Sequence, residues 1–546
     1  MNSNEKRNRK GNYIIFGAVD IGSYEIRMKI FEISKKKGIH EIDHVRRILV
    51  LGRDTYEGGV IENDLVDQLC IVLHEFRQIM RSYHVDVEYV YATSAIREAK
   101  NKPMVLHQIR VRTGFEVEVL DNAKQRFLGY KSIASKEDAF RSMILHPTAI
   151  VDMDGGSLQI SLFDREHLVT TQNLKAGILR VMEKIFYLEN MPDISRRDTG
   201  MKWVPDSFSM QMSDATVRNY EELVEELIGS EIREFMKLYL KERNIRNVVA
   251  VSDFMTQTLR KLDKSVEGYA ITAREFEELY GRLKRYSTEE IISEMQISSE
   301  YARLLQPAMI IYKRVIKEMG AQYLWIPGTY LNDGVAYDYA EKRHLIRSRH
   351  DFEKDILESA KHLSGRYAGC RSHMELLDAI TIELFDAIKR VSGLRQREGL
   401  LLRIAVLLKD CGHYISLSNP AESSYNIIRA TELIGLSLKE RDMVAYAVRN
   451  MTLPMIAYEE LTKSLGMEEA VTVIKLSAIL KLVNAMDLSY KQKFQSIRAV
   501  LKEKELVITV DTREDITLEK ALFRVEADAF LEVFHVRPVF RQKRSW

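Results

Sequence analysis

Two short turns rich in Asp, Gly and Ser hold the residues best suited to phosphate chemistry. The first reads Asp20-Ile-Gly-Ser23, and the second reads Asp152-Met-Asp-Gly-Gly-Ser157. Glycine lets the backbone approach a ligand, successive N–H groups and a serine hydroxyl cradle an anion, and a carboxylate can hold Mg²⁺. A single turn of this kind is more often structural. Two of them, each following a strand at the equivalent place in a repeated unit, predict a site in which both turns hold one phosphate ligand. The predicted phosphate-binding residues of the turns are Asp20, Gly22, Ser23, Gly155, Gly156 and Ser157. Asp20 and Asp152 are also candidate Mg²⁺ ligands.

A third segment, Ala92 to Ala99, lies between the two turns at a predicted strand-to-helix junction. Thr93 and Ser94 place two hydroxyls at the start of the helix, and Arg97 follows one turn later. A helix N-terminus and a guanidinium both favour phosphate oxygens. We therefore predict that Thr93 and Ser94 bind phosphate and that Arg97 is catalytic. The structural alternative is that one hydroxyl caps the helix and Arg97 lies on a solvated face.

Strand and helix patterns alternate around these segments. The order strand, Gly/Ser turn, strand of residues 14–33 recurs from Ala149 to Asn173, which predicts a duplicated α/β unit. From about Asp351 the pattern changes to nearly continuous amphipathic helix, and alternation returns over residues 505–525. The predicted organisation is a disordered basic tail over 1–12, lobes over 13–135 and 136–345, an all-α domain over 346–500 and an α+β piece over 501–546. We expect the last helix of the second lobe to return to the first.

Composition limits the classes of partner. The chain has 546 residues, too many for one core, and its 81 basic and 79 acidic residues give a net charge of +2. Any attraction for a polyanion must therefore be local, and no basic stripe with interleaved aromatics predicts nucleic-acid binding. Three widely spaced cysteines suggest a reducing compartment. The sequence contains no apolar run of about 18 residues, the length that a membrane-spanning helix needs. We expect a cytoplasmic protein.

Together these motifs resemble the Ppx/GppA family of exopolyphosphatases and guanosine pentaphosphate phosphohydrolases. The most specific string is Ala92-Thr-Ser-Ala-Ile-Arg-Glu-Ala99, supported by the two turns and by Leu174 to Arg180. The resemblance implies an α/β fold of duplicated actin-like, RNase H-type (ASKHA) lobes. It implies inorganic polyphosphate or guanosine penta- or tetraphosphate held between the lobes, Mg²⁺-assisted attack of water on the terminal phosphate, and a homodimer.

The catalytic positions implied by the resemblance are altered in this chain. The family has an acidic pair, one member of which is its expected base, where this chain has Lys124-Gln125. Its second turn leads to a catalytic glutamate where this chain has Gln159. A general base contributes about 10²- to 10⁴-fold, and neither Lys nor Gln supplies one, although Gln can orient water. Arg97, Asp152 and the degenerate positions Lys124 and Gln159 thus form the predicted catalytic set, with impaired hydrolysis.

Asp154 and residues 249–254 depart from the family's phosphate cradle. Asp154 replaces a cradle glycine, and at about 4 Å with an effective dielectric near 20 it would repel a phosphate charge by roughly 4 kcal/mol. We hypothesise that Lys124 and Asp154 compensate each other across the cleft. Asp253 and Phe254 would obstruct another glycine-rich turn of the family.

The helical region resembles the family's HD-type domain over residues 399–412 and 424–435. A metal-binding HD domain needs a His-Asp pair, but here the pair is Lys409-Asp410. A protonated lysine has no lone pair for a metal, so Asp487 at the last acidic position lacks partners and we expect no metal. The expected role is structural. Two readings of the whole chain remain open: a divergent phosphoanhydride hydrolase, and a regulatory or binding protein that retains the fold but hydrolyses little.

Overall fold

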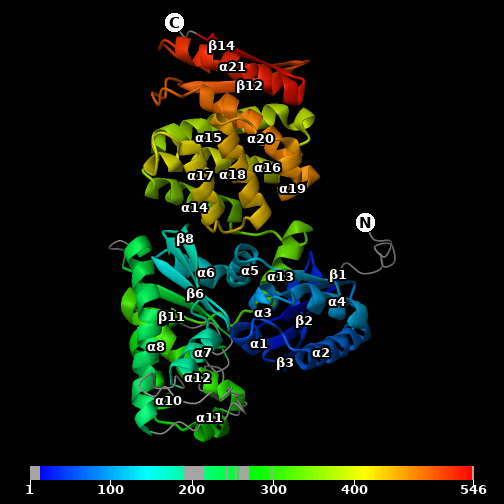
Figure 1. Ribbon diagram of the computed structural model, residues 1–546, viewed down its shortest axis with the longest axis vertical. Helices are drawn as coiled ribbons and strands as arrows, with labels where there is room; N and C mark the ends of the chain where they lie inside the picture. The colour runs from blue at the N-terminus through cyan, green and yellow to red at the C-terminus, as the bar shows by residue number, and fades with distance from the viewer. Residues whose placement is uncertain are drawn as a thin grey trace, which may run out of the picture. The chain divides into compact units, whose positions relative to one another are not determined.

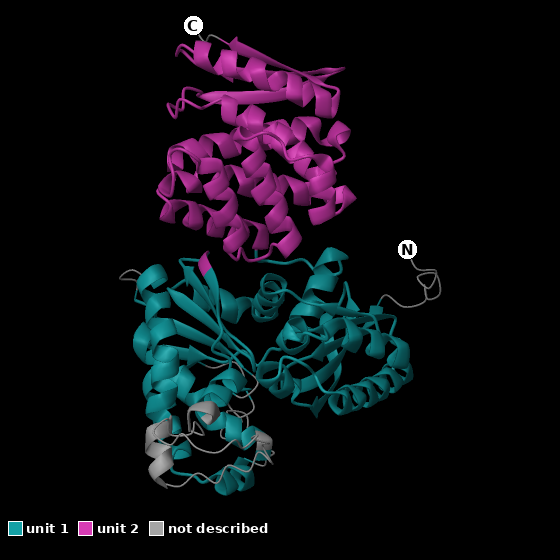
Figure 2. Cartoon of the chain, in the orientation of Figure 1, with its two compact units in different colours: residues 1–167, 171–350 teal, residues 168–170, 351–546 magenta. Residues whose placement is uncertain are grey.

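The computed structural model describes residues 13–189, 214–240, 244–252, 255–256, 270–295, 297 and 299–543. The tail predicted over 1–12 and the positions Asp253 and Phe254 lie outside these residues. The chain divides into two compact units, residues 1–167 with 171–350 and residues 168–170 with 351–546 (Figure 2). Each unit is described by itself.

A five-stranded sheet of order β3-β2-β1-β4-β5 forms the first lobe (Figure 1). Antiparallel pairing joins β1 to β2 and β2 to β3, whereas β4 runs parallel to both β1 and β5. The strands are β1 (Tyr13–Ile21), β2 (Glu25–Ser34), β3 (Gly38–Ile48), β4 (Val87–Ala92) and β5 (Val117–Val119). The helices are α1 (Leu51–Glu57), α2 (Asn63–Ser82), α3 (Ser94–Glu98), α4 (Lys102–Thr113) and α5 (Asn122–Ala134).

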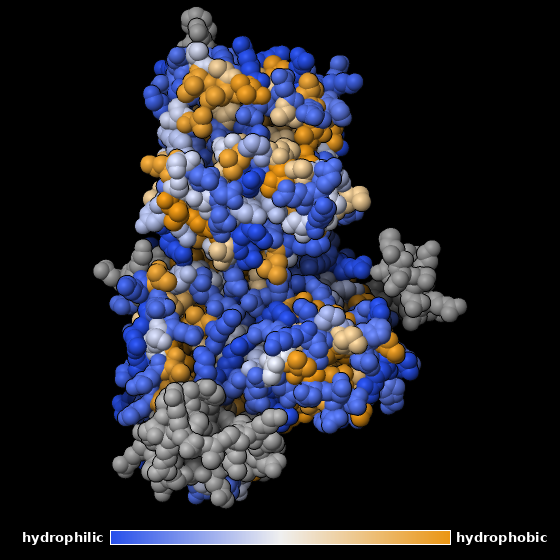
Figure 3. Space-filling model, viewed as in Figure 1, coloured by the Kyte–Doolittle hydropathy of each residue, from blue (hydrophilic) through white to orange (hydrophobic). Residues whose placement is uncertain are grey.

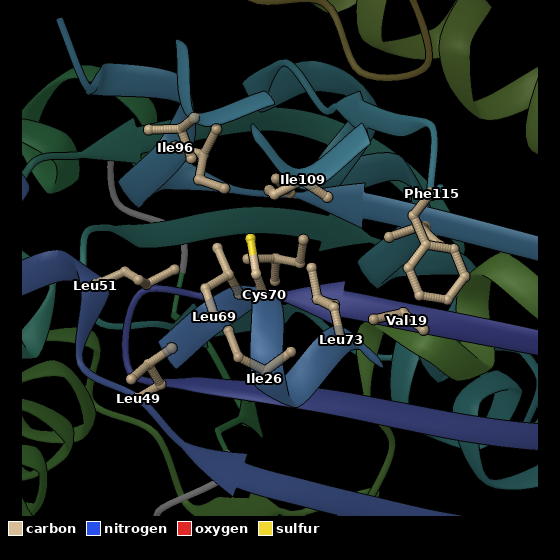
Figure 4. Close-up of a cluster of buried hydrophobic side chains, with 14 of the residues drawn as sticks. Val19, Ile26, Leu49, Leu51, Leu69, Cys70, Leu73, Ile96, Ile109 and Phe115 are labelled. Atoms are coloured by element: carbon tan, nitrogen blue, oxygen red, sulfur yellow. The ribbon is translucent and has the colours of Figure 1, made fainter. Parts of the chain in front are cut away.

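One face of this sheet packs against α2 and α4. Val19 and Ile26 of the sheet share a buried cluster with Leu69 and Leu73 of α2 and Ile109 of α4 (Figure 4). Alternation along the strands and helical spacing along α2 bring these side chains to one side. Each such side chain contributes about 1.5–3 kcal/mol on burial, so this core fixes the strand ends that hold the first turn.

The other face is covered by a helix from much later in the chain. Val335 and Ala336 of α13 (Leu331–Lys342) share a buried cluster with Phe16 and Phe31. The Nδ2 of Asn332 also donates to the carbonyl of Ala18 on β1 at 2.9 Å. The helix that ends the second lobe in sequence is therefore part of the first lobe's core.

The second lobe repeats the first around a six-stranded sheet of order β10-β11-β9-β6-β7-β8. The run β8-β7-β6-β9-β11 has the strand order of the first sheet, with β6 antiparallel to β7 and parallel to β9, and β9 parallel to β11. The strands are β6 (Thr148–Met153), β7 (Leu158–Asp164), β8 (His167–Leu174), β9 (Asn247–Val251), β10 (Ala270–Thr272) and β11 (Tyr323–Trp325). The helices are α6 (Glu137–Ile144), α7 (Ile178–Glu189), α8 (Asp214–Phe235), the π-helical η1 (Met236–Leu240), α10 (Ala273–Leu283), α11 (Thr288–Met295) and α12 (Ser299–Met319). The repeat confirms the predicted two-lobe, actin-like fold.

The second unit is helical and ends in a small sheet. Its helices are α14 (Phe352–Arg366), α15 (Arg371–Ser392), α16 (Gln396–Leu408), the 3₁₀ helix η2 (Cys411–Tyr414), α17 (Pro420–Ala430), α18 (Leu438–Thr452), α19 (Tyr458–Leu465) and α20 (Met467–Ala485). A sheet of order β12-β13-β14 follows, made of β12 (Ser496–Lys502), β13 (Glu505–Asp511) and β14 (Arg537–Lys543), with α21 (Thr517–Phe534) joining the parallel strands β13 and β14. The helix α16 is buried almost all round, as its run Leu-Leu-Leu-Arg-Ile-Ala-Val-Leu-Leu predicts.

Across the described part of the chain, no helix has both the length and the apolarity needed to cross a bilayer. On the face of the molecule seen in Figure 3, apolar residues are scattered among hydrophilic ones.

Candidate functional site

The two predicted turns open onto one cavity within the first unit. Both follow the central strand of a lobe, the first after β1 and the second after β6. The cavity has a volume of about 110 Å³. The predicted site residues that line it are Asp20, Gly22, Ser23, Thr93, Asp152 and Gly155. Residues for which no role was predicted also line it, among them Glu25, Arg27 and Tyr330.

The first turn holds its serine within a cluster of three hydroxyls. The Oγ of Ser23 lies 2.8 Å from the Oγ of Ser94 and 2.8 Å from the hydroxyl of Tyr56 on α1. Tyr56 also donates to Ser94 at 3.1 Å. Burial, with a further contribution from the nearby charge of Asp154, raises the pKa of Tyr56 to about 12, so its hydroxyl stays neutral at physiological pH. Both predicted serines therefore bond to a protein hydroxyl.

In the second turn, backbone N–H groups that were expected to bind an anion bind the side chain of Asp154. The Oδ1 of Asp154 accepts hydrogen bonds from the backbone N–H groups of Gly156 at 2.7 Å and Ser157 at 2.5 Å. The hydroxyl of Ser157 lies 3.3 Å from the same oxygen. These are the donors that the sequence assigned to phosphate. The carboxylate of Asp154 thus occupies the cradle, in addition to bringing a negative charge to the cavity wall.

Glycine at position 156 allows the two turns to meet. A Cβ there would lie 2.1 Å from the Tyr56 hydroxyl oxygen and 2.7 Å from the Ser94 Oγ, so no larger residue fits without movement. Arg180 of α7 joins the same contact, because its Nε donates to the Gly156 carbonyl at 2.7 Å. Its guanidinium stacks 4.2 Å from the centre of the Tyr56 ring and forms an ion pair with Glu98 of α3. The two lobes are therefore bound together at the site.

A chain of hydrogen bonds connects Arg97 to Asp154 through Gln125. Arg97 donates to the carbonyl of Leu120 at 2.8 Å and to the Oε1 of Gln125 at 2.9 Å. The Nε2 of Gln125 donates to the Oδ2 of Asp154 at 3.1 Å. These partners fix the orientation of the amide, because only its oxygen can accept from Arg97. Gln125 lines the cavity, whereas Arg97 does not line it and is connected to it through Gln125.

Lys124 lies outside the cavity lining and contacts other residues. Its ammonium pairs with Glu118 and donates to the Tyr89 hydroxyl at 3.1 Å. Burial disfavours the charged carboxylate of Glu118, yet the hydrogen bonds from Lys124 and Tyr89 hold its pKa below the usual value. The hypothesised compensation of Asp154 by Lys124 is therefore wrong. The neighbouring Gln125 contacts Asp154 instead.

Gln159 is buried in the second sheet. It pairs with Asp152 in the register of β6 and β7, and its Nε2 lies 3.4 Å from the Oγ of Ser157. Its Oε1 has no hydrogen-bond partner among the described residues, and its side chain does not line the cavity. In this arrangement Gln159 contacts Ser157 of the second turn without reaching the cavity.

The donor set around the cavity suits Mg²⁺. Asp20 and Asp152 bring one carboxylate from each lobe to the cavity wall. Mg²⁺ typically takes one or two protein carboxylates and completes its shell with water and ligand phosphates. Within the part of the chain that the structure describes, no group of three or more His, Cys, Asp or Glu side chains is placed to hold a metal. Any Mg²⁺ here would therefore depend on the ligand.

The second unit contains a buried charged cluster around Lys409. The ammonium of Lys409 lies 2.8 and 2.7 Å from the two carboxylate oxygens of Asp410. His373 of α15, which sequence reasoning missed, has its Nδ1 2.7 Å from Asp487 and its Nε2 3.6 Å from Asp410. Tyr490 stacks on the His373 ring with centroids 3.9 Å apart. Burial lowers the pKa of Lys409, while Asp410 opposes that shift.

Known proteins resemble the chain over parts of their lengths. A bifunctional 3-dehydroquinate synthase/phosphatase of Fusobacterium nucleatum is 22% identical over 276 residues, covering 46% of this chain and 40% of that protein. Exopolyphosphatase 1 of Mycobacterium leprae is 25% identical over 201 residues, covering 37% of this chain and 57% of that protein. The chain thus spans roughly half the length of these relatives.

Solved structures of similar proteins cover about 60% of this chain at low sequence identity. An exopolyphosphatase from Cytophaga hutchinsonii has a TM-score of 0.48 and 17% identity, covering 60% of this chain and 98% of that one. A Ppx/GppA family member from Aquifex aeolicus has a TM-score of 0.46 and 19% identity, covering 61% and 99%.

Family models match most of the sequence. The model described as the Ppx/GppA phosphatase family matches residues 29–343, which is more than half of the chain, and the model of Ppx/GppA phosphatase domain III matches residues 358–529. With the duplicated lobes and the two turns at their junction, these matches show that the chain belongs to the Ppx/GppA phosphatase family.

Proposed function

We propose that this protein binds phosphoanhydrides, either inorganic polyphosphate or guanosine penta- or tetraphosphate, and hydrolyses them slowly. The cavity between the two lobes is the binding site. Family membership and the likeness to an exopolyphosphatase support the class of ligand. The observation that carries the slow hydrolysis is the amide of Gln125 on the cavity wall. Gln125 is one of the two positions, with Lys124, where the family resemblance implies an acidic pair that includes the base.

Binding would use the first turn and the two strand-end carboxylates. Gly22 gives close access to the backbone, and the Thr93 hydroxyl lines the same wall, so both can approach phosphate oxygens. Asp20 and Asp152 would hold Mg²⁺, which when bound neutralises phosphate charge. The N–H donors of Gly156 and Ser157 become available only when the carboxylate of Asp154 moves away from them.

Hydrolysis would lack a proton acceptor at the expected place. The oxygen of Gln125 already accepts from Arg97, and an amide is too weak a base to take a proton from water. The missing general base accounts for a loss of about 10²- to 10⁴-fold in rate. Arg97 supports Gln125 here, and its role as a catalytic residue stays a proposal.

A regulatory protein without catalysis is the second candidate. The observation that favours it is the occupation of the anion-binding groups by the protein itself: Asp154 in the second turn and the Tyr56 hydroxyl beside Ser23 and Ser94. Such a protein would bind phosphate only after a local rearrangement.

Phosphate release in the presence of Mg²⁺, with long-chain polyphosphate and guanosine pentaphosphate as substrates, tests the proposal. We expect measurable binding and release close to background. The combined substitution Gln125→Glu with Asp154→Gly should raise turnover by about 100-fold or more, since it restores a base and clears the cradle. Gln125→Glu alone is the matched control and should stay slow, because its carboxylate would face that of Asp154. Wild-type turnover of 1–10³ s⁻¹, the ordinary range for enzymes, would contradict the proposal, and so would absence of binding.

We also propose that the helical region of the second unit is an HD-type domain with a structural role. Its buried Lys409 pairs with Asp410, and His373 lies between Asp410 and Asp487. A lysine therefore stands among residues of metal-binding type. The homodimer implied by the family is likewise a proposal, which light scattering of the purified protein tests.

A further inference from the structure

Glu25 is a buried carboxylate on the cavity wall to which the sequence motifs assign no role. It is the first residue of β2, and its backbone carbonyl accepts from the N–H of Gly22 in the first turn at 3.0 Å. Alternation along β2 places Ile26 and Met28 in the core shared with α2 and puts Glu25 and Arg27 on the opposite face of the sheet. Both residues line the cavity there, so the carboxylate belongs to the site.

One oxygen of this carboxylate has a partner, and the other has none among the described residues. The Oε1 of Glu25 forms an ion pair with Arg27, whose guanidinium lies 3.9 Å from the centre of the Tyr330 ring. The Oε2 is buried and accepts no hydrogen bond from the described part of the chain. Glu25 as a whole is 7% exposed, so bulk water does not replace the missing partner. A buried charged oxygen left in this way is costly, and it indicates a functional role or a bound water.

The other carboxylates of the cavity wall already have work to do. They are Asp20, Asp152 and Asp154. Asp154 accepts through both oxygens, with its own turn on one and Gln125 on the other. Asp20 and Asp152 are the proposed Mg²⁺ ligands, and a bound cation holds a carboxylate in its charged form and makes it a poor proton acceptor. Glu25 is therefore the carboxylate of the wall that is left to accept a proton.

Two other roles for Glu25 agree less well with the structure. Within the described part of the chain, no group of three or more His, Cys, Asp or Glu side chains is placed to hold a metal, so Glu25 does not complete a metal site with Asp20 and Asp152. A counterion to Arg27 needs only Oε1 and leaves the burial of Oε2 unexplained. The cavity has a volume of about 110 Å³, and a water needs roughly 15 Å³, so there is room for a water beside Glu25 together with a phosphate group. A carboxylate within reach of such a water is what general-base catalysis requires.

We propose that Glu25 is the proton acceptor for the slow hydrolysis. This inference rests on the proposed function and names the residue that sustains its residual rate. The oxygen of a water attacks the terminal phosphorus of the phosphoanhydride, and a proton of that water passes to the Oε2 of Glu25. The bond between phosphorus and the bridging oxygen breaks, and the shortened polyphosphate or nucleotide leaves with the electron pair. Glu25 then loses the proton to solvent, while Arg27 acts as a positioning residue that holds the carboxylate through Oε1.

The test measures release of the labelled terminal phosphate of guanosine pentaphosphate and of polyphosphate, with Mg²⁺ present and the protein in excess. Glu25→Gln removes the proton acceptor but keeps an oxygen that can accept from Arg27, so the fold should be preserved. Glu32→Gln is the matched control, because it removes the same charge from the same strand at a position outside the cavity. Circular dichroism and the melting temperature verify that each variant is folded, and calorimetry gives the Kd of each substrate.

We expect Glu25→Gln to lower the rate of phosphate release by about 10²-fold with little change in Kd, and Glu32→Gln to leave both unchanged. Glu25→Ala, a second variant, should be equally slow. Formate at high concentration should restore part of its rate, whereas chloride, which is an anion but not a base, should not. In a chain that carries Gln125→Glu and Asp154→Gly, the further change Glu25→Gln should have little effect, because position 125 then supplies the base.

The possible outcomes separate this inference from the proposed function. A wild type that binds and slowly hydrolyses its substrate, with Glu25→Gln as fast, would overturn the role of Glu25 alone. An equal loss in the chain with both other substitutions, or rescue by chloride as well as formate, would overturn it too, since Glu25 would then only neutralise Arg27. A wild type that binds but releases no phosphate would overturn the role of Glu25 and leave the binding site standing. A wild type that binds neither substrate would overturn the proposed function and this inference together.

Discussion

Replacing Asp154 by glycine should tighten the binding of phosphate ligands. In the structure its carboxylate accepts hydrogen bonds from the N–H groups of Gly156 and Ser157 and from the amide of Gln125. The substitution removes that carboxylate, so two backbone donors become available to a phosphate oxygen. It also removes a negative charge from the wall of the cavity in which the ligand would lie.

The size of the effect follows from the charge and the donors. A unit charge at about 4 Å with an effective dielectric near 20 repels a phosphate charge by roughly 4 kcal/mol, or about 10³-fold in Kd. Counterions and Mg²⁺ screen part of this repulsion, so we expect a gain of about 10²-fold. Asp154→Asn is the matched control. It keeps an oxygen that can accept from Gly156 and Ser157 but removes the charge, so its gain should be smaller than that of glycine.

Calorimetric titration with tripolyphosphate, with and without Mg²⁺, measures both gains. Loss of the hydrogen bonds within the turn should cost about 1–3 kcal/mol of unfolding free energy, which urea denaturation of the variants checks. If wild type, Asp154→Asn and Asp154→Gly bind the ligand with the same Kd while remaining folded, Asp154 does not control access to the cradle. The reasoning from its contacts would then be refuted.

Three other substitutions test separate parts of the structure. Lys124 helps to hold the pKa of Glu118 below its usual value, which contributes stability at neutral pH that is lost as the pH falls through the folded-state pKa. Lys124→Met should therefore lower the free energy of unfolding, measured by urea denaturation, by less than about 1 kcal/mol at pH 7, and the loss should shrink as the pH is lowered and Glu118 becomes protonated. A loss that does not change with pH would contradict the pairing. Tyr56→Phe removes the hydroxyl that donates to Ser94, and it should lower the free energy of unfolding, measured by urea denaturation, by about 1 kcal/mol. The affinity for tripolyphosphate should rise several-fold. Weaker binding would show that the Tyr56 hydroxyl itself contacts the ligand. Lys409→His should bind one Co²⁺ or Zn²⁺ per chain, detected by metal analysis and a raised melting temperature, whereas Lys409→Met should bind none; metal in the wild type would contradict the role of the ammonium.

The sequence was sufficient to predict the repeated lobes and the meeting of their turns. Apolar strands followed by Asp, Gly and Ser are local patterns, and duplication of a topology brings equivalent turns to the same junction. The contact of Asp154 with its own backbone was also within reach of local reasoning, because Asp side chains commonly accept from N–H groups two and three residues later. The charge of Asp154 predicts only repulsion of an anion, whereas in the structure its carboxylate also accepts the hydrogen bonds of its own turn.

Contacts between distant segments could not be predicted in the same way. Tyr56 lies 33 residues from Ser23 in sequence, and nothing in the short helix α1 indicates that its hydroxyl reaches the turn. His373 likewise is a single histidine on a long helix, and only the packing of the helical unit brings it to Asp487. The pair Lys124-Gln125 illustrates a further limit. Consecutive residues of a helix point in directions about 100° apart, so only one of them could face the cavity, and the sequence did not say which.

The changes at positions 125 and 154 are best understood as one coupled change. The Nε2 of Gln125 donates to Asp154 at 3.1 Å, so a glutamate at position 125 would bring two carboxylates together. One of them would have to take up a proton or move, as happens when like charges share a site. Conversely, with glycine at 154, Gln125 would lose an acceptor for its amide. A single substitution toward the family's residues therefore meets a penalty that the double substitution avoids. We therefore expect any gain in turnover to require both substitutions, Gln125→Glu and Asp154→Gly, in the same chain.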